Sequence, residues 1–196
     1  MGREQDMSEH PLIEAVFENV EAVIDAAIQD DVIKNIPVVG TVAKLLKAAG
    51  NLRDKIFEAK LARFLQPLNE TTPEAREKIR QKAAASPDEA REVGEAVLLV
   101  VEKITALDKA QILAYVFIAY TQGHIGPTDF LRLCDAIDQS FVYDLKEFLG
   151  KRKTGHDTNA AYMKHLSRTG ITFADPRKIF RTPEDHYYAV RVWASS

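Results

Sequence analysis

Residues 112–120 constrain the fold of this chain more than any other stretch, because this run holds nine residues without a charge. A helix of about 15 residues that is apolar on nearly all sides must be covered by other elements. The run therefore predicts the central helix of a bundle, around which the other helices pack. Asp108 and Gln111 have the spacing of a capping box before this helix, and Gly123 can adopt the left-handed conformation that ends one. The run is shorter than the roughly 18 uncharged residues of a membrane span.

Charge divides the chain into two unequal parts. The chain has 196 residues and a formal charge of -3, which is too small to indicate a general affinity for nucleic acid or membranes. Residues 1–140 carry 16 Lys and Arg against 23 Asp and Glu, a net of -7, whereas residues 141–196 carry 10 against 6, a net of +4. We therefore expect a helical bundle over 1–140 and a small basic appendage over 141–196.

The cellular compartment is indicated by the only cysteine and by the first residues. A single cysteine, Cys134, excludes an internal disulfide and is typical of a reducing compartment. The first dozen residues are polar and acidic, where a signal peptide would need a basic start and an apolar run. Both features predict a cytoplasmic protein.

The N-terminal part of the bundle is predicted from two helical patterns. Apolar residues recur at helical spacing over 13–28, after Pro11, and predict an amphipathic helix. Residues 36–65 form either one helix or two, with a weak point at Gly50 and an end imposed by Pro67. The small and β-branched residues at the start of 36–65 would also suit a membrane-active effector. Three lysines interrupt that part of the pattern, so we prefer a buried helix.

The next two helices of the bundle carry start signals in the sequence. Thr72 before Pro73 predicts an N-cap with proline in the first turn. Ser86 followed by Glu89 predicts a capping box. The helix that begins there should bury one apolar face, formed by Val93, Val97, Leu98, Val100, Val101 and Ile104.

Another amphipathic helix is predicted beyond the turn at residues 123–127. Its apolar positions are Phe130, Leu131, Leu133, Cys134 and Ile137. Cys134 lies in the apolar phase of this helix, so we expect a buried side chain rather than a nucleophile.

The last 56 residues change from helical to strand-like patterns. A short helix is predicted over 142–149, a basic turn over 151–155, and a helix capped by Asp157 that runs to Gly170. Two strand-like runs at 171–173 and 187–193 flank a loop at 174–186.

This order of elements resembles the winged-helix arrangement, a helix-turn-helix followed by a β-hairpin. The resemblance implies that residues 159–168 could enter a major groove while the loop acts as the wing. The candidate phosphate contacts are then Arg152, Lys153, Lys164, Arg168, Arg177, Lys178 and Arg181.

Binding of protein rather than DNA is also compatible with a winged helix, and two observations favour it. A net charge of +4 over 56 residues is modest for a DNA-binding domain. The exposed positions of the second helix, Asn159, Lys164, His165 and Arg168, offer few groups for bidentate readout of bases. DNA binding is therefore the second hypothesis.

Enzymatic chemistry is not indicated by any motif. The chain has no phosphate-cradling glycine loop and no cysteine or serine with an evident histidine partner. His156, His165 and His186 match no familiar zinc spacing. The acidic stripe of the first helix, formed by Glu14, Glu18, Glu21 and Asp25, is typical of a solvated face. We expect no catalytic residues, no cofactor and no bound metal.

Residues 36–149 resemble uncharacterised small helical bacterial proteins associated with mobile elements and phage defence. The resemblance is carried by IPVVGTVAKLLK, by RDKIFEAKLARFL, and by the pair AYTQG and DFLRLCDAID. It implies a bacterial source and a role in regulation or defence, and it transfers no site residues. The sequence as a whole predicts a non-enzymatic interaction protein, a regulator, sensor or adaptor, that binds a protein partner or itself. The alternatives are a DNA-binding regulator and a membrane-active effector that uses residues 36–65.

Overall fold

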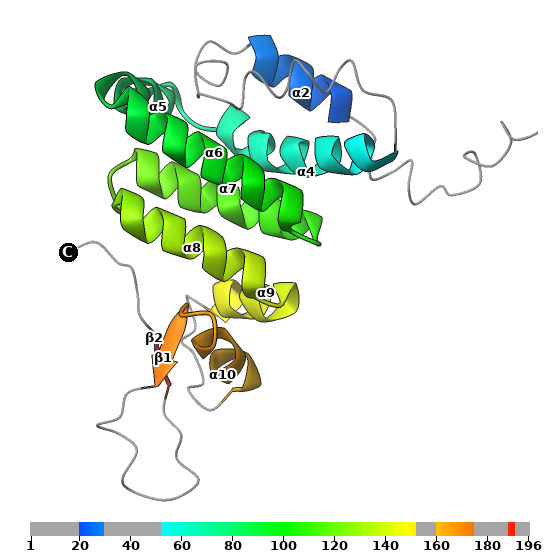
Figure 1. The fold of residues 1–196 in the computed structure, drawn as a ribbon, viewed down its shortest axis with the longest axis vertical. Coiled ribbons are helices and arrows are strands. Elements are labelled where there is room, and N and C mark those ends of the chain that lie inside the picture. Colours follow the sequence, from blue (N-terminus) through cyan, green and yellow to red (C-terminus); the bar gives the residue numbers. More distant parts are fainter. Residues whose placement is uncertain (1–19, 30–51, 152–159, 175–187, 191–196) are drawn as a thin grey trace, which may run out of the picture.

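A computed structural model describes residues 20–29, 52–151, 160–174 and 188–190. This part of the chain is mainly helical, which confirms the predicted class (Figure 1). Its elements are α2 (Val20–Gln29), α4 (Leu52–Asn69), α5 (Pro73–Ala85), α6 (Pro87–Lys103), α7 (Leu107–Thr121), α8 (Pro127–Gln139), α9 (Val142–Lys151), α10 (Ala161–Ser167), β1 (Thr172–Ala174) and β2 (Tyr188–Val190).

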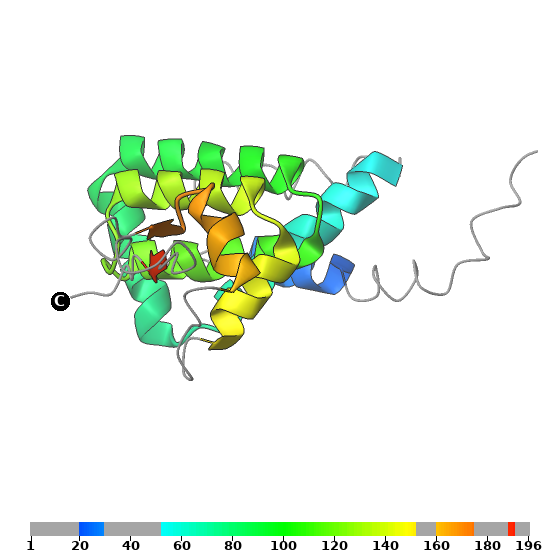
Figure 2. The ribbon, with the colours of Figure 1, turned by 90° about the horizontal axis from the view of Figure 1, so that it is seen from below.

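Helix α7 lies at the centre of the bundle, as the apolar run predicts. It packs against α4, α5 and α8, while α6 packs against α4, α5 and α8 and α2 lies on α4. Figure 1 shows these helices at one end of the molecule and α9, α10 and the strands at the other, and Figure 2 shows α9 and α10 in front of the bundle when it is seen from below. One face of α7 is not covered, because Tyr115 is 55% exposed. An apolar run on all sides of a helix therefore did not require burial on all sides.

An aromatic cluster joins three helices at the core. Phe117 of α7 contacts Phe64 of α4 and Phe130 of α8, with ring centroids 5.7 and 6.0 Å apart. Tyr120 also packs on Phe130 at 5.1 Å. Such ring pairs contribute about 0.5–1.5 kcal/mol each beyond the apolar area that they bury. The cluster explains why α4, α7 and α8 stay in fixed contact.

The predicted helix starts after Thr72 and after Ser86 are confirmed, whereas the two predicted capping boxes are wrong. The Thr72 side chain accepts a hydrogen bond from the Ala75 amide at 3.3 Å, as expected of an N-cap. Helix α7 begins after Ala106, and Asp108 instead forms an ion pair with Lys146 of α9 at 2.5 Å. The Ser86 hydroxyl makes no cap hydrogen bond, and the Glu89 carboxylate binds Tyr120 of α7 and Lys82 of α5 instead of the Ser86 amide.

Of the two predicted helix ends, the one at Gly123 is confirmed and the one at Pro67 is wrong. Gly123 adopts a φ of 79°, and the His124 amide donates to the Ala119 carbonyl at 2.9 Å, so the predicted left-handed end of α7 is confirmed. Pro67 does not end α4, which continues to Asn69. The helix continues because Leu68, which is 1% exposed, packs into the core beyond the proline.

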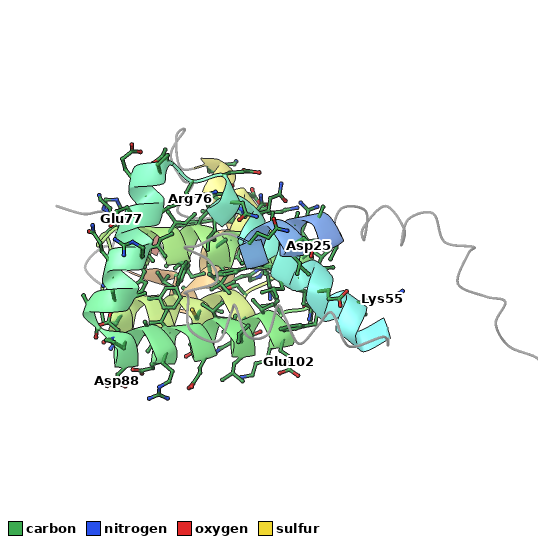
Figure 3. All side chains as sticks on the ribbon, turned by 90° about the horizontal axis from the view of Figure 1, so that it is seen from above. Asp25, Lys55, Arg76, Glu77, Asp88 and Glu102 are labelled. Atoms are coloured by element: carbon green, nitrogen blue, oxygen red, sulfur yellow. The ribbon has the colours of Figure 1, made fainter. Side chains whose placement is uncertain are left out.

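At three helix ends, a cationic side chain of another helix donates a hydrogen bond to a backbone carbonyl group. Lys60 donates to the Glu102 carbonyl of α6 at 2.9 Å, and Lys109 donates to the Asp138 carbonyl of α8 at 2.7 Å. Arg76 donates to the Asn69 carbonyl, the last of α4, and Figure 3 shows Arg76 on α5 and Glu102 at the end of α6. A cation at this position satisfies an unpaired carbonyl and the negative end of the helix dipole.

The C-terminal part consists of α9, α10 and a short two-stranded sheet. β1 and β2 pair antiparallel, with Thr172 opposite Val190. The N-cap of α10 is Ala160, so the prediction that Asp157 caps this helix is wrong. Gly170 has a φ of 81° and turns the chain from α10 into β1. The loop predicted as a wing lies outside the described residues, so the winged-helix arrangement stays a prediction.

Candidate functional site

An aromatic pair at the start of α9 is the most exposed apolar feature of the described residues. Phe141 is 62% exposed and Tyr143 is 68% exposed, and their ring centroids lie 5.3 Å apart. Helix α9 is amphipathic, and it directs Leu145 and Phe148 toward the core. Phe141 precedes the first residue of α9, and Tyr143 lies on the side of the helix away from Leu145, so both rings are left to solvent.

Two hydrogen bonds fix the segment that carries the aromatic pair. The Ser140 hydroxyl lies 2.9 Å from the Thr169 hydroxyl, and the Asp144 carboxylate lies 3.1 Å from Nδ1 of His165. Ser140 is buried and its hydroxyl also donates to the Ala136 carbonyl at 2.6 Å. The start of α9 is thereby held against the exposed edge of α10.

The predicted nucleic-acid contacts can be placed only in part. Lys164 on α10 and Arg168, the residue that follows α10, are exposed and stand four positions apart. The remaining candidates lie outside the described residues: Arg152, Lys153, Arg177, Lys178 and Arg181. The structure therefore brings two of the seven candidates onto one face and leaves the others as predictions.

A second polar cluster joins α5, α6 and α7. The Tyr120 hydroxyl donates to the Glu89 carboxylate, and Lys82 forms an ion pair with Glu89 at 3.4 Å. The Lys82 ammonium also lies 4.4 Å from the centroid of the Tyr120 ring, within cation–π distance. The hydrogen bond from Tyr120 lowers the pKa of Glu89, and burial together with that hydrogen bond raises the pKa of Tyr120.

A small cavity lies beside this cluster. It measures about 20 Å³ and is lined mainly by apolar side chains, among them Ile79, Val93 and Phe117. This volume holds about one water-sized group, so it does not accommodate a cofactor or a typical metabolite. The cluster is best understood as a set of structural contacts that link α5, α6 and α7.

The surroundings of Cys134 disfavour a role for its thiol as a nucleophile. The side chain is 1% exposed, and burial raises the pKa of the thiol to about 12. A thiol with this pKa is almost fully protonated at neutral pH and is a poor nucleophile. The prediction that Cys134 is a core residue is confirmed.

Metal binding finds no support in the part of the chain that the structure describes. Over those residues, no three His, Cys, Asp or Glu side chains gather in a way that could hold an ion. Glu14, Glu18, His156 and His186 lie outside this part, whereas His165 lies on α10 and contacts Asp144.

Membrane crossing is also without support over the same ranges. None of the helices described is long and apolar enough to span a bilayer. The second half of residues 36–65 belongs to α4, whose Leu61, Phe64 and Leu65 are fully buried in the bundle. Residues 36–51 lie outside the described residues.

Sequence reasoning missed both the aromatic pair and the polar cluster. Tyr143 had a usable signal, because it falls out of phase with Leu145 and Phe148, whereas Phe141 has the spacing of that buried face and gave none. The contact of Glu89 with Tyr120 had no local signal, because 31 residues separate the two.

Comparison of the chain with protein-family models, with curated proteins and with solved structures finds no match.

Proposed function

We propose that this chain is a non-enzymatic protein-binding module, acting as a regulator, sensor or adaptor, and that the Phe141–Tyr143 pair is its contact surface. The observation that carries the proposal is the exposure of both rings, 62% and 68%, at a fixed position on the molecule. Aromatic side chains are enriched in protein interfaces and dominate their binding energy. Leaving two adjacent rings in water is unfavourable unless a partner covers them.

The fixed position of the pair strengthens the proposal. The residues on either side of the pair are Ser140 and Asp144. Ser140 is hydrogen-bonded to Thr169, just after α10, and Asp144 to His165 of α10. A partner therefore meets a surface that is already ordered, and little conformational entropy is lost at the anchor when it binds.

Site-specific photo-crosslinking tests this function. A photoreactive phenylalanine analogue replaces Tyr143 in the full chain, and in a matched control it replaces Tyr115, which is 55% exposed on α7. We expect a defined crosslinked protein from position 143 and none from position 115. The purified partner should then bind the wild type, and binding should weaken by about tenfold or more in the double variant F141S/Y143S. Equal crosslinking from both positions would contradict the proposal.

DNA binding through the C-terminal part is the second candidate function. It is favoured by the exposure of Lys164 on α10 and of Arg168 directly after it, because neither forms an ion pair with another described residue. DNA affinity that depends on phosphate contacts falls with salt, with a logarithmic slope of about -0.9 for each contact.

A titration of the full chain with duplex DNA separates the two candidates. A protein-binding module should show no binding above the nonspecific level at physiological salt. Submicromolar affinity that is sequence-dependent, and that K164A/R168A weakens together with a shallower salt slope, would instead establish the DNA-binding function.

The other functional hypotheses rest on the sequence alone. A membrane-active role for residues 36–65 would require α4 to leave the core that it helps to form. The bacterial source and the link to defence stay predictions.

A further inference from the structure

The aromatic pair and two exposed cations belong to segments that are held side by side. Ser140 contacts Thr169, and Asp144 contacts His165, at 2.9 and 3.1 Å. Lys164 directly precedes His165, and Arg168 directly precedes Thr169. These two contacts therefore hold residues 140–144, which carry the aromatic rings, against residues 164–169, which carry the cations.

The charges of this unit are not balanced. Among its described residues, 141–151 and 160–174, there are four Lys or Arg and two Asp or Glu. Lys146 pairs with Asp108 and Lys151 with Glu147, while Asp144 is hydrogen-bonded to His165. Lys164 and Arg168 are thus left facing solvent with no carboxylate of the described residues within ion-pair distance.

The rest of the molecule carries the opposite charge. Among the described residues, 20–29 and 52–140 hold 12 Lys or Arg against 16 Asp or Glu, whereas 141–151 and 160–174 hold four against two. An acidic partner is repelled by the bundle and attracted to the C-terminal unit, so the field of the whole protein directs it to the α9–α10 surface. A basic partner would be directed to the other end of the molecule.

We propose that the partner is an acidic protein segment, with an apolar side chain that packs on Phe141 and Tyr143 and carboxylates that meet Lys164 and Arg168. This inference rests on the proposed function and adds the chemical class of the partner. Apolar contact with the rings supplies most of the affinity, and the cations supply the selection for acidic sequences. A protein segment is favoured over nucleic acid because two cations neutralise few phosphates, and nucleic-acid affinity grows with their number.

Selection from a phage-displayed library of random 16-residue peptides tests the inference on the full chain. The wild type is compared with F141S/Y143S, with K164E/R168E, and with the control R63E/K78E, which makes the same charge change at two exposed positions of the bundle. Circular dichroism verifies that each variant keeps its helical content. We expect enriched peptides with Asp or Glu beside a large apolar residue.

One enriched peptide is then synthesised, and its affinity for the wild type is compared with its affinity for each variant. We expect K164E/R168E to weaken binding by about tenfold and R63E/K78E to leave it unchanged. A peptide with Lys in place of its acidic residues should recover affinity for K164E/R168E.

The other outcomes separate the two proposals. Neutral or basic peptides that are lost with F141S/Y143S would overturn the acidic partner and leave the protein-binding function standing. Peptides that never depend on the aromatic pair would overturn both. Tighter binding of a 20-nucleotide oligonucleotide that depends on Lys164 and Arg168, or a dimer in sedimentation that F141S/Y143S dissociates, would also overturn the acidic partner.

Discussion

Glu89 stands three residues after Ser86, the spacing of a capping box, yet its carboxylate accepts a hydrogen bond from Tyr120 and pairs with Lys82 at 3.4 Å. A side chain with two possible uses goes to the one that satisfies more partners. Here the contact between helices satisfies a hydroxyl that is mostly buried and an ammonium, whereas the Ser86 amide, which the cap would bind, already donates to the Lys82 carbonyl at 3.3 Å. Sequence spacing identifies only the local use, because the distant partners are brought near by the tertiary fold.

Removal of the Tyr120 hydroxyl tests this contact. Y120F keeps the ring in the aromatic cluster but removes the hydroxyl that donates to Glu89 and leaves Lys82 as its partner, so we expect the free energy of unfolding to fall by about 1 kcal/mol. The control Y115F removes an exposed hydroxyl and should change it little. Urea denaturation of both variants gives the comparison, and equal stability of Y120F and Y115F would show that the hydrogen bond contributes nothing.

The same carboxylate predicts a dependence of stability on pH. The Tyr120 hydroxyl holds the pKa of Glu89 below its usual value, so the unfolded chain binds more protons between the two pKa values. The contribution of Glu89 is therefore complete above about pH 5 and is lost as the pH falls through the folded pKa. We expect the stability of the wild type to fall more steeply in acid than that of E89Q. Parallel slopes in a series of urea titrations from about pH 7 to pH 3 would contradict this assignment.

Cys134 gives a third prediction for a single residue. Because burial raises the pKa of its thiol to about 12, the native protein should react with a disulfide reagent only as fast as it unfolds. C134S should lose about 1–2 kcal/mol of stability, since a hydroxyl replaces a soft apolar group in the core. Absorbance after addition of the reagent measures the rate, and rapid labelling of the native protein would mean that the thiol is accessible.

At the scale of elements, the sequence predicted where helices form better than how they end. The buried face of α6 follows directly from apolar spacing, and all six of its predicted residues are buried. Thr72 and Gly123 act as predicted because their effects depend on neighbouring backbone groups alone. Pro67 and Asp108 differ from expectation because the core contact of Leu68 and the ion pair with Lys146 come from distant parts of the chain.

The cation at the end of α8 can be tested in the same way. K109M keeps the buried aliphatic part of the side chain but removes the ammonium that donates to the backbone carbonyl of Asp138. We therefore expect the free energy of unfolding to fall by about 1 kcal/mol. K103M, at an exposed position of α6, is the control. Hydrogen exchange should become faster in the last turn of α8 in K109M, and protection equal to that of the wild type would show that the lysine does not stabilise this end.

At the scale of the whole molecule, charge divides the chain as the sequence indicates, and the contacts across the division come only from the structure. Asp108 of α7 pairs with Lys146 of α9, and Ser140 after α8 contacts Thr169 after α10. The charge imbalance could be read from composition, because charge is additive along a sequence. The exposure of Tyr143 could be read from helical spacing, whereas the exposure of Phe141, which has the spacing of the buried face, depends on where α9 begins and how it lies on the bundle.

T169V tests how firmly α10 is held to the bundle. The change removes the hydroxyl that contacts Ser140, so we expect faster hydrogen exchange in α10 and unchanged protection in α6 and α7. Exchange followed by mass spectrometry resolves these segments. A uniform increase over all helices would mean that α10 opens only when the whole protein unfolds.

The cations at the ends of α4, α6 and α8 also bear on how the chain acquires its structure. Lys60 reaches α6 over 42 residues of sequence, and Lys109 reaches α8 over 29. The last carbonyl groups of these helices gain their partners only when a neighbouring helix has docked. Secondary structure and tertiary packing are therefore completed in the same step, which favours a single cooperative folding transition over the assembly of finished helices.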